Sequence, residues 1–160
     1  AGGPRAPDAT IGPLIDLEAS LGLNRPEGVR TFNGRLEGIK ARLTELLAHL
    51  KTGNRTIAGY GAPTKATTLM THFGLGRDML DFIVDDNPLK QGFFVPVSHV
   101  PIGAADLIYE RKPDFVLILA WNFAQSIMDR HTRYVAEGGR FVVPMPEPRL
   151  VAKEREAEPR

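Results

Sequence analysis

The sequence predicts an α/β fold, in which five mostly parallel strands form a doubly wound sheet with helices on both faces. Short, almost wholly apolar runs alternate along the chain with segments whose apolar residues recur every three or four positions. Unbroken apolar runs are typical of parallel strands buried on both sides. Right-handed crossovers then favour a Rossmann-like sheet with strand order 3-2-1-4-5, preceded here by a long helix.

Size and charge limit the possible classes of protein. A chain of 160 residues corresponds to about one domain. The net charge of +1 offers no field of one sign for a nucleic-acid backbone, so nucleic acid is not an expected partner. The longest apolar run, residues 115–121, is too short to cross a hydrocarbon core of about 30 Å, so no membrane is expected either. The absence of cysteine excludes disulfides and fits a reducing compartment such as the cytoplasm.

The first part of the chain predicts a linker and then the long helix. The sequence begins at Ala1 without an initiator Met, which indicates a piece of a longer protein. Residues 1–28 are rich in Gly and Pro and predict a linker or part of a preceding segment, with one short helical turn at Leu14–Leu21. A helix from about Val29 to Lys51 is predicted by apolar residues at steps of three and four, namely Phe32, Leu36, Ile39, Leu43, Leu46, Leu47 and Leu50. The domain is expected over residues 29–150, with a charged tail over 151–160.

The remaining elements follow in alternation. The strands are expected at 55–60, 80–84, 93–97 or 100–102, 115–121 and 140–144. Helices are expected after Pro63, at 104–111 and from Phe123 to Val135. Pro144, Pro146 and Pro148 are expected to end regular structure.

Three polar loops should meet at one edge of this sheet. Loop 1 is Gly61–Lys65, loop 2 is Asp85–Gly92 and loop 3 is Trp121–Phe123; they follow the first, second and fourth predicted strands. Ligands of such sheets bind beyond the carboxyl ends of the strands, where the strand order reverses. We therefore predict a binding site at this edge, formed by Gly61, Ala62, Pro63, Thr64, Lys65, Asp85, Asn87, Lys90, Trp121 and Asn122.

Loop 1 is close to a dinucleotide-binding fingerprint. Gly59-Tyr60-Gly61-Ala62-Pro63-Thr64 reads G-x-G-x-x-T, with Thr64 in place of the third glycine. One interpretation is a tight turn without a cofactor. The other is an anion site, where the backbone of residues 62–64 and Lys65 bind a phosphate at the helix N-terminus.

Loops 2 and 3 could complete the site. Asp86 is interpreted as a turn former with Asn87-Pro88, whereas Asp85, Asn87 and Lys90 are expected to contact a ribose or sugar. Two carboxylates disfavour a neighbouring phosphate, so the anion is placed nearer Lys65 and Lys90. Trp121 and Asn122 either form a pocket wall or belong to the core and cap the next helix.

The four histidines indicate no catalytic or metal site. None of them has a partner at the spacing of a metal site or a Ser–His pair, and His49 and His131 are expected on the surface of helices. The residues therefore predict no catalytic group and no metal ligand in this chain.

Taken in order, these motifs resemble a known family. Residues 58–65, 81–92, 113–123 and 138–146 together resemble the C-terminal domain of the S-adenosylmethionine-dependent C-methyltransferases that act on nucleotide-linked deoxysugars. The resemblance covers about residues 30–148. The family pattern A-P-A-K-G-N is replaced here by Ala62-Pro63-Thr64-Lys65-Ala66-Thr67, which alters how closely a ligand can approach the helix.

The resemblance implies a division of labour. The full enzymes have a zinc-binding N-terminal domain, a middle domain that binds S-adenosylmethionine and carries the histidine base, and a Rossmann-like domain that helps to bind the nucleotide sugar. Methyl transfer goes to a carbon beside a keto group. This chain is then expected to bind substrate next to the methyltransferase domain, to hold no cofactor itself and to be inactive alone.

Two alternatives remain open from the sequence. The chain could be a fragment of a nicotinamide-dependent oxidoreductase, which would bind NAD. It could also be a ligand-free architectural domain that packs on the methyltransferase domain through the Phe32–Leu50 stripe.

Overall fold

The computed structural model describes residues 8–151, and the chain divides into two compact units, Ala1–Gly38 and Ile39–Arg160. We call them the helical unit and the sheet unit. The helical unit contains α1 (Ile11–Ser20) and the first half of α2 (Pro26–Leu50). Helix α1 is longer than the single turn predicted at Leu14–Leu21. The assignment of residues 1–28 as a linker stays a prediction, and the charged tail from residue 152 lies outside the described residues.

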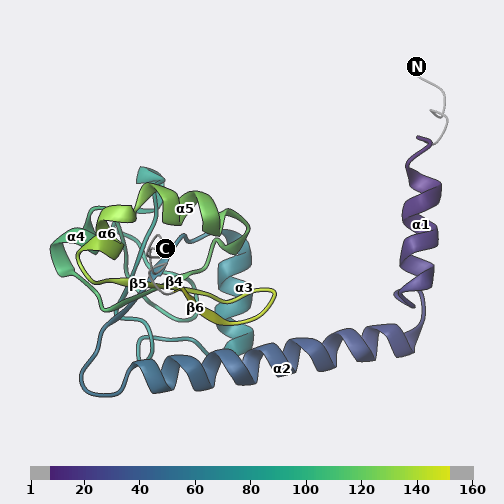
Figure 1. Cartoon of the computed structure of the whole chain (residues 1–160), viewed down its shortest axis with the longest axis horizontal. Helices are drawn as coiled ribbons and strands as arrows, with labels where there is room; N and C mark the ends of the chain where they lie inside the picture. Colours follow the sequence, from purple (N-terminus) through teal and green to yellow (C-terminus); the bar gives the residue numbers. More distant parts are fainter. Residues whose placement is uncertain (1–7, 152–160) are drawn as a thin grey trace, which may run out of the picture. The chain divides into compact units, whose positions relative to one another are not determined.

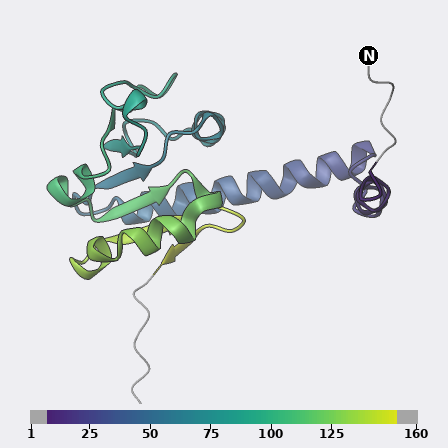
Figure 2. The same cartoon turned by 90° about the horizontal axis from the view of Figure 1, so that it is seen from above.

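The sheet unit contains one sheet of six strands in the order β3-β2-β1-β4-β5-β6. The strands are β1 (Ile57–Tyr60), β2 (Phe82–Val84), β3 (Ile102–Gly103), β4 (Phe115–Ile118), β5 (Arg140–Val143) and β6 (Arg149–Val151). The first five are parallel, so the predicted α/β class and the order 3-2-1-4-5 are confirmed. Figure 2 shows the strands side by side.

The sixth strand was not predicted. The Pro residues between 144 and 148 were expected to end regular structure, but they occupy the connection and not the strand. Arg149–Val151 then pairs antiparallel with β5, with Val142 opposite Leu150. An edge strand carries unpaired backbone N–H and C=O groups, and β6 satisfies those of β5. The expected number of five strands is therefore corrected to six.

Helices cover both faces of the sheet, as predicted (Figure 1). Alternate strand residues point to opposite faces. Ile57, Ile83 and Leu117 pack in one core with α2 and with α3 (Thr64–Phe73). Ala58, Val84 and Val116 pack in a second core with α4 (Leu107–Arg111), α5 (Ala124–Arg130) and α6 (Thr132–Ala136).

The second half of α2 belongs to the core of the sheet unit. Ile39, Leu43, Leu47 and Leu50 are buried against the strands, whereas Phe32 is 51% exposed. The stripe from Phe32 to Leu50 is therefore not available as a whole to another domain, because this unit's own sheet covers it from Ile39 onward. Among residues 8–151, no helix has the length and apolar character needed to cross a membrane.

Candidate functional site

The three polar loops lie together at the carboxyl edge of the sheet. Loop 1 contacts loop 2 through a hydrogen bond of 2.6 Å from the Ala62 N–H to a carboxylate oxygen of Asp85. It contacts loop 3 through the Lys65 Nζ, which lies 4.6 Å from the centre of the Trp121 ring. The folded chain thus brings together segments that are about 20 and 30 residues apart in sequence, where the strand order reverses.

Gly61 makes the close packing of loops 1 and 3 possible. Its φ angle is +87°, a left-handed conformation that residues with a side chain rarely adopt. A Cβ placed on Gly61 would lie only 2.7 Å from the Cβ of Ala120. The second glycine of the fingerprint is therefore needed for two reasons: it adopts a left-handed backbone conformation, and it lets loop 1 pack closely against Ala120.

Asp85 holds loops 1 and 2 together. It is only 7% exposed, and its oxygens accept hydrogen bonds from the N–H groups of Ala62 and Asn87 and from the Lys90 Nζ at 3.0 Å. Burial alone would raise the pKa of Asp85, but these hydrogen bonds and the Lys90 charge outweigh it and lower the pKa below its ordinary value. The carboxylate predicted to bind a ribose is thus already satisfied within the protein.

These contacts limit which backbone groups can bind an anion. The Ala62 N–H is engaged by Asp85, and Pro63 has no N–H. The first turn of α3 still offers the N–H groups of Thr64 and Lys65, which have no partner four residues before them in the helix. Of the backbone groups of residues 62–64, only the Thr64 N–H is therefore left to bind an anion, and the phosphate-binding role of this segment and of Lys65 stays a prediction.

The other predicted site residues take several positions on the same edge. The Asn87 side chain accepts a hydrogen bond from the Leu89 N–H and caps the 3₁₀ helix η1 (Pro88–Lys90). Trp121 and Asn122 belong to a second 3₁₀ helix, η2 (Trp121–Phe123). Trp121 is partly buried and packs against the core, whereas Asn122 is exposed. Their roles in binding stay predictions.

An open groove of about 460 Å³ adjoins this cluster. Thr64, Thr67 and Thr68 of α3 line one side, and Leu89, Phe93 and Phe94 line the other. Lys90 also lines the groove, whereas Trp121 and Asn122 are not among its lining residues. Thr67, Thr68, Phe93 and Phe94 are not among the site residues predicted from the sequence, and Thr67 and Thr68 were interpreted there as structural. The spacing of the three threonines places them on one face of the helix, and this pattern could have indicated Thr67 and Thr68.

Asp86 has a different role from the one predicted. Its carboxylate accepts a hydrogen bond of 2.8 Å from the Tyr60 hydroxyl and pairs with Arg130 at 3.0 Å. The interpretation of Asp86 as a turn former is corrected, because the residue that caps the turn is Asn87.

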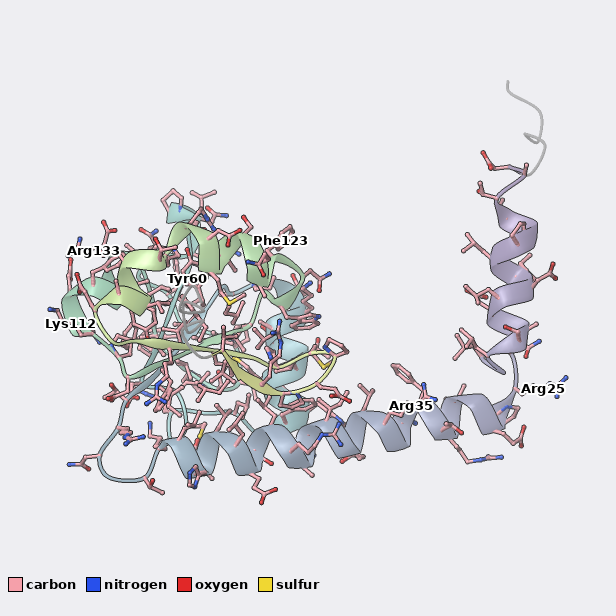
Figure 3. All side chains as sticks on the ribbon, viewed as in Figure 1. Arg25, Arg35, Tyr60, Lys112, Phe123 and Arg133 are labelled. Carbon is pink, nitrogen blue, oxygen red and sulfur yellow. The ribbon has the colours of Figure 1, made fainter. Side chains whose placement is uncertain are left out.

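His131 is buried and not on the surface, so that prediction is wrong. It is 8% exposed and lies between two tyrosines, with Nε2 at 2.9 Å from the Tyr60 hydroxyl and Nδ1 at 2.7 Å from the Tyr109 hydroxyl. Figure 3 shows Tyr60 within the sheet unit, beneath α5 and α6. The spacing from Ile127 to His131, one helical turn, places the histidine on the buried face and was the missed signal. In residues 8–151 no three His, Asp or Glu side chains are grouped so as to hold a metal ion.

Two comparisons with known proteins agree on one family. The family model described as "C-methyltransferase C-terminal domain" matches residues 1–146. The chain is 37% identical over 155 residues to the C-methyltransferase NovU of Streptomyces niveus, in an alignment that covers 94% of this chain and 37% of NovU. It therefore spans little more than a third of that relative. Among solved structures, the UDP-D-quinovosamine 4-dehydrogenase of Vibrio fischeri is similar with a TM-score of 0.40 at 16% identity, over 55% of this chain and 75% of that one.

Proposed function

Because this chain belongs to the family of C-methyltransferase C-terminal domains, we propose that it is the part of a C-methyltransferase that binds a nucleotide-linked sugar. The observation that carries the proposal is the meeting of loops 1, 2 and 3 at the carboxyl edge, through Ala62, Asp85, Lys65 and Trp121. In a doubly wound sheet this edge is where ligands bind.

The diphosphate is placed at the start of α3. The N–H groups of Thr64 and Lys65 point from the first helical turn, and the helix dipole favours negative charge there. The Lys65 ammonium lies over Trp121 and forms no ion pair with any residue between 8 and 151, so it can turn toward a phosphate. Charge-assisted hydrogen bonds of this kind are about twice as strong as neutral ones.

The sugar and ribose hydroxyls are placed next to loop 2. Lys90 and the amide of Asn87 are the groups we propose for these contacts, with Trp121 and Asn122 at the side of loop 3. Asp85 already accepts hydrogen bonds from three donors within the protein, so about one acceptor position is left for a ribose hydroxyl. Its first role in this proposal is to hold loop 1 against loop 2.

The methyl transfer itself is assigned to the rest of a longer protein. The chain covers 37% of NovU, so most of that relative lies outside the match. We propose that S-adenosylmethionine, which supplies the methyl group, and the base that activates the sugar carbon belong to that remaining part. This chain would then act as its substrate-binding partner and be inactive alone.

The geometry speaks against a nicotinamide-binding fragment. Thr64 replaces the glycine that allows close helix–strand packing over a pyrophosphate. The acidic residue that would bind the adenosine ribose is Asp85, and its oxygens bond to Ala62, Asn87 and Lys90.

Calorimetric titration of the 160-residue chain tests the proposal. We expect TDP or UDP to bind and NAD not to bind. Lys65→Ala should weaken the binding of the diphosphate by roughly tenfold or more, since a hydrogen bond to a charged group contributes about 1.5–3 kcal/mol.

Lys112→Ala is the matched control, because Lys112 precedes β4 and Figure 3 shows it at the other end of the sheet unit from Phe123. Equal weakening by both variants, or tight binding of NAD alone, would contradict the proposal.

A further inference from the structure

We propose that the groove between α3 and residues 88–96 holds the sugar ring of the nucleotide sugar, with the hydroxyls of Thr64, Thr67 and Thr68 facing its polar groups and Phe93 and Phe94 facing its C–H surface. This inference rests on the proposed function, and it adds Thr67, Thr68, Phe93 and Phe94 to the site.

The first wall of the groove is a row of hydroxyls. Thr64, Thr67 and Thr68 are spaced i, i+3 and i+4 on α3 and line the groove together. Thr44 in α2 bonds its hydroxyl to the Lys40 carbonyl one turn earlier, as helical threonines often do. The three groove threonines make no such side-chain hydrogen bond to any described residue. Their hydroxyls can both donate to and accept from a ligand.

The spacing of this row suits a six-membered sugar ring. Four residues along a helix correspond to a rise of about 6 Å, so the hydroxyls of Thr64 and Thr68 are about one turn apart. Hydroxyls on opposite sides of a six-membered sugar ring span a similar length, whereas neighbouring hydroxyls are closer together. A ring that lies along α3 can therefore meet more than one threonine at once.

The opposite wall is apolar and unusually exposed. Leu89, Phe93 and Phe94 are 82%, 65% and 56% exposed, although large apolar side chains are mostly buried elsewhere in the sheet unit. Exposed apolar side chains that lie next to one another often mark a binding site. The ring faces of phenylalanine are flat apolar surfaces on which the C–H face of a sugar can stack.

Backbone hydrogen bonds hold this wall in place. The Gly92 N–H donates to the Ile102 carbonyl at 2.9 Å, and the Ile102 N–H donates to the Phe93 carbonyl at 2.8 Å. The Val95 N–H donates to the Val100 carbonyl at 2.9 Å, and the Val95 side chain is buried. The two phenyl groups are thus presented by a segment anchored on both sides, which lowers the entropy cost of binding.

A sugar fits these two walls better than a nucleobase does. Apart from Lys90, the polar groups that line the groove are the threonine hydroxyls and the rest of the lining is apolar, and no carboxylate, amide or arginine side chain is there to read the edge of a base. Lys90 lines the groove as well. A diphosphate near Lys65 and Lys90 would therefore carry its attached sugar directly into it.

The test compares two affinities of the 160-residue chain. Calorimetry gives the dissociation constants of TDP, TDP-glucose and TDP-rhamnose, and the ratio of TDP to TDP-sugar measures what the sugar contributes. In wild type we expect at least one TDP-sugar to bind more tightly than TDP. The double variant Thr67→Val/Thr68→Val should reduce that ratio by roughly two- to tenfold per lost hydrogen bond, with the affinity for TDP unchanged.

The chain offers matched controls for both walls. Thr71→Val removes an exposed hydroxyl from the same helix, one turn beyond the groove, and should leave the ratio unchanged. Phe93→Ala should reduce the ratio, whereas Phe32→Ala, which removes an exposed phenyl group from the first half of α2, should not.

Three results would overturn the inference. Equal weakening of TDP and TDP-sugar by the groove variants would place the base or the phosphates there. An unchanged ratio in these variants, or no gain from either sugar in wild type, would show that the groove does not hold the sugar. If TDP itself fails to bind, the proposed function fails, and this inference falls with it.

Discussion

At the scale of single residues, Asp85 shows how one buried carboxylate can organise a site. Its bonds to the backbone of loop 1, to the backbone of its own loop and to Lys90 replace the water that the charge loses on burial. These hydrogen bonds offset the free-energy cost of burying the charge, and they hold loops 1 and 2 together. A residue that the sequence suggests as a ligand contact is thus first a structural link.

Replacing Asp85 with Asn should destabilise the fold. The substitution keeps the shape but removes the charge, so we expect a loss of about 1.5–3 kcal/mol in the free energy of unfolding measured in urea. Asp78→Asn, at an exposed position of the same unit, should change it by less than about 0.5 kcal/mol. Similar losses in both variants would show that the hydrogen bonds of Asp85 do not add to the free energy of unfolding.

The pH dependence of this contribution follows from the direction of the shift. The pKa of Asp85 is lower in the folded than in the unfolded state, so the unfolded state takes up the proton first as the pH falls. Its stabilisation is present above the unfolded pKa of about 3.9 and is lost as the pH falls toward the folded pKa. The difference in stability between wild type and Asp85→Asn should therefore shrink below about pH 4.

His131 joins two tyrosines into a chain of directed hydrogen bonds. Tyr60 donates its hydroxyl proton to Asp86, so its oxygen accepts from the Nε2–H of His131, and Nδ1 accepts from the hydroxyl of Tyr109. This arrangement requires a neutral imidazole. Burial lowers the pKa of His131, the nearby Arg130 lowers it further, and Asp86 and Asp106 act weakly in the opposite direction.

Mild acid should therefore weaken the fold through His131. The unfolded state binds a proton near pH 6.5, whereas the folded state resists it, so stability should fall as the pH drops from about 7 through the unfolded pKa. Urea unfolding between pH 5 and 8 measures this slope, and His131→Gln should flatten it. His49→Gln, at an exposed position of α2, should not; an unchanged slope in His131→Gln would contradict the assignment.

At the scale of elements, the turn from β1 into α3 decides where the site lies. Gly59 leaves room for Ile83 and Leu119, since a Cβ there would lie 2.7 and 2.9 Å from their side chains. Gly61 then allows the chain to turn beside Ala120 before α3 begins at Thr64. The glycines of the fingerprint are thus required by strand packing and turn geometry, whatever ligand is bound.

Gly61→Ala should cost more stability than Gly74→Ala. Both residues have positive φ angles, +87° and +69°, but a Cβ at Gly74 meets nothing within 4 Å, whereas one at Gly61 meets Ala120. We expect about 1 kcal/mol for the strain at Gly74 and about 1–3 kcal/mol more at Gly61 from the clash. Thermal unfolding compares them, and equal losses would show that loops 1 and 3 move apart freely.

At the scale of the whole molecule, α2 contributes to both units. Before Gly38 the helix belongs to the helical unit, in which Leu14, Leu21 and Val29 are half exposed or more. From Ile39 onward its apolar residues complete the core of the sheet unit. Removing all of residues 29–52 would therefore destroy that core.

A shorter truncation should leave the sheet unit folded. Deleting residues 1–34 keeps Ile39, Leu43 and Leu47, so we expect a single cooperative transition with a midpoint within a few degrees of wild type. Leu43→Ala should cost about 2–5 kcal/mol, because its side chain is fully buried. Leu14→Ala, at a side chain that is 57% exposed, is the control. Loss of the transition on truncation would show that the two units depend on one another.

The order of the elements and the edge of the sheet at which the three polar loops meet could both be predicted from the amino-acid sequence. The local spacing of apolar residues predicts both strands, such as residues 115–118, and the helix whose stripe runs from Ile39 to Leu50. Once the sheet is parallel, the loops after β1, β2 and β4 must meet at one edge. Both predictions require only the local pattern of apolar residues and the rule that crossovers between parallel strands are right-handed.

The partners of the polar side chains became apparent in the folded chain and not before. Asp85 could have faced a ligand, but it bonds to Ala62, and His131 lies buried against Tyr60, 71 positions before it. The pairing of Arg149–Val151 with β5 and the opposed walls of Thr67 and Phe93 likewise join distant segments. Local spacing can indicate the face on which a side chain lies, but the partner it meets there depends on where the packed core places each backbone.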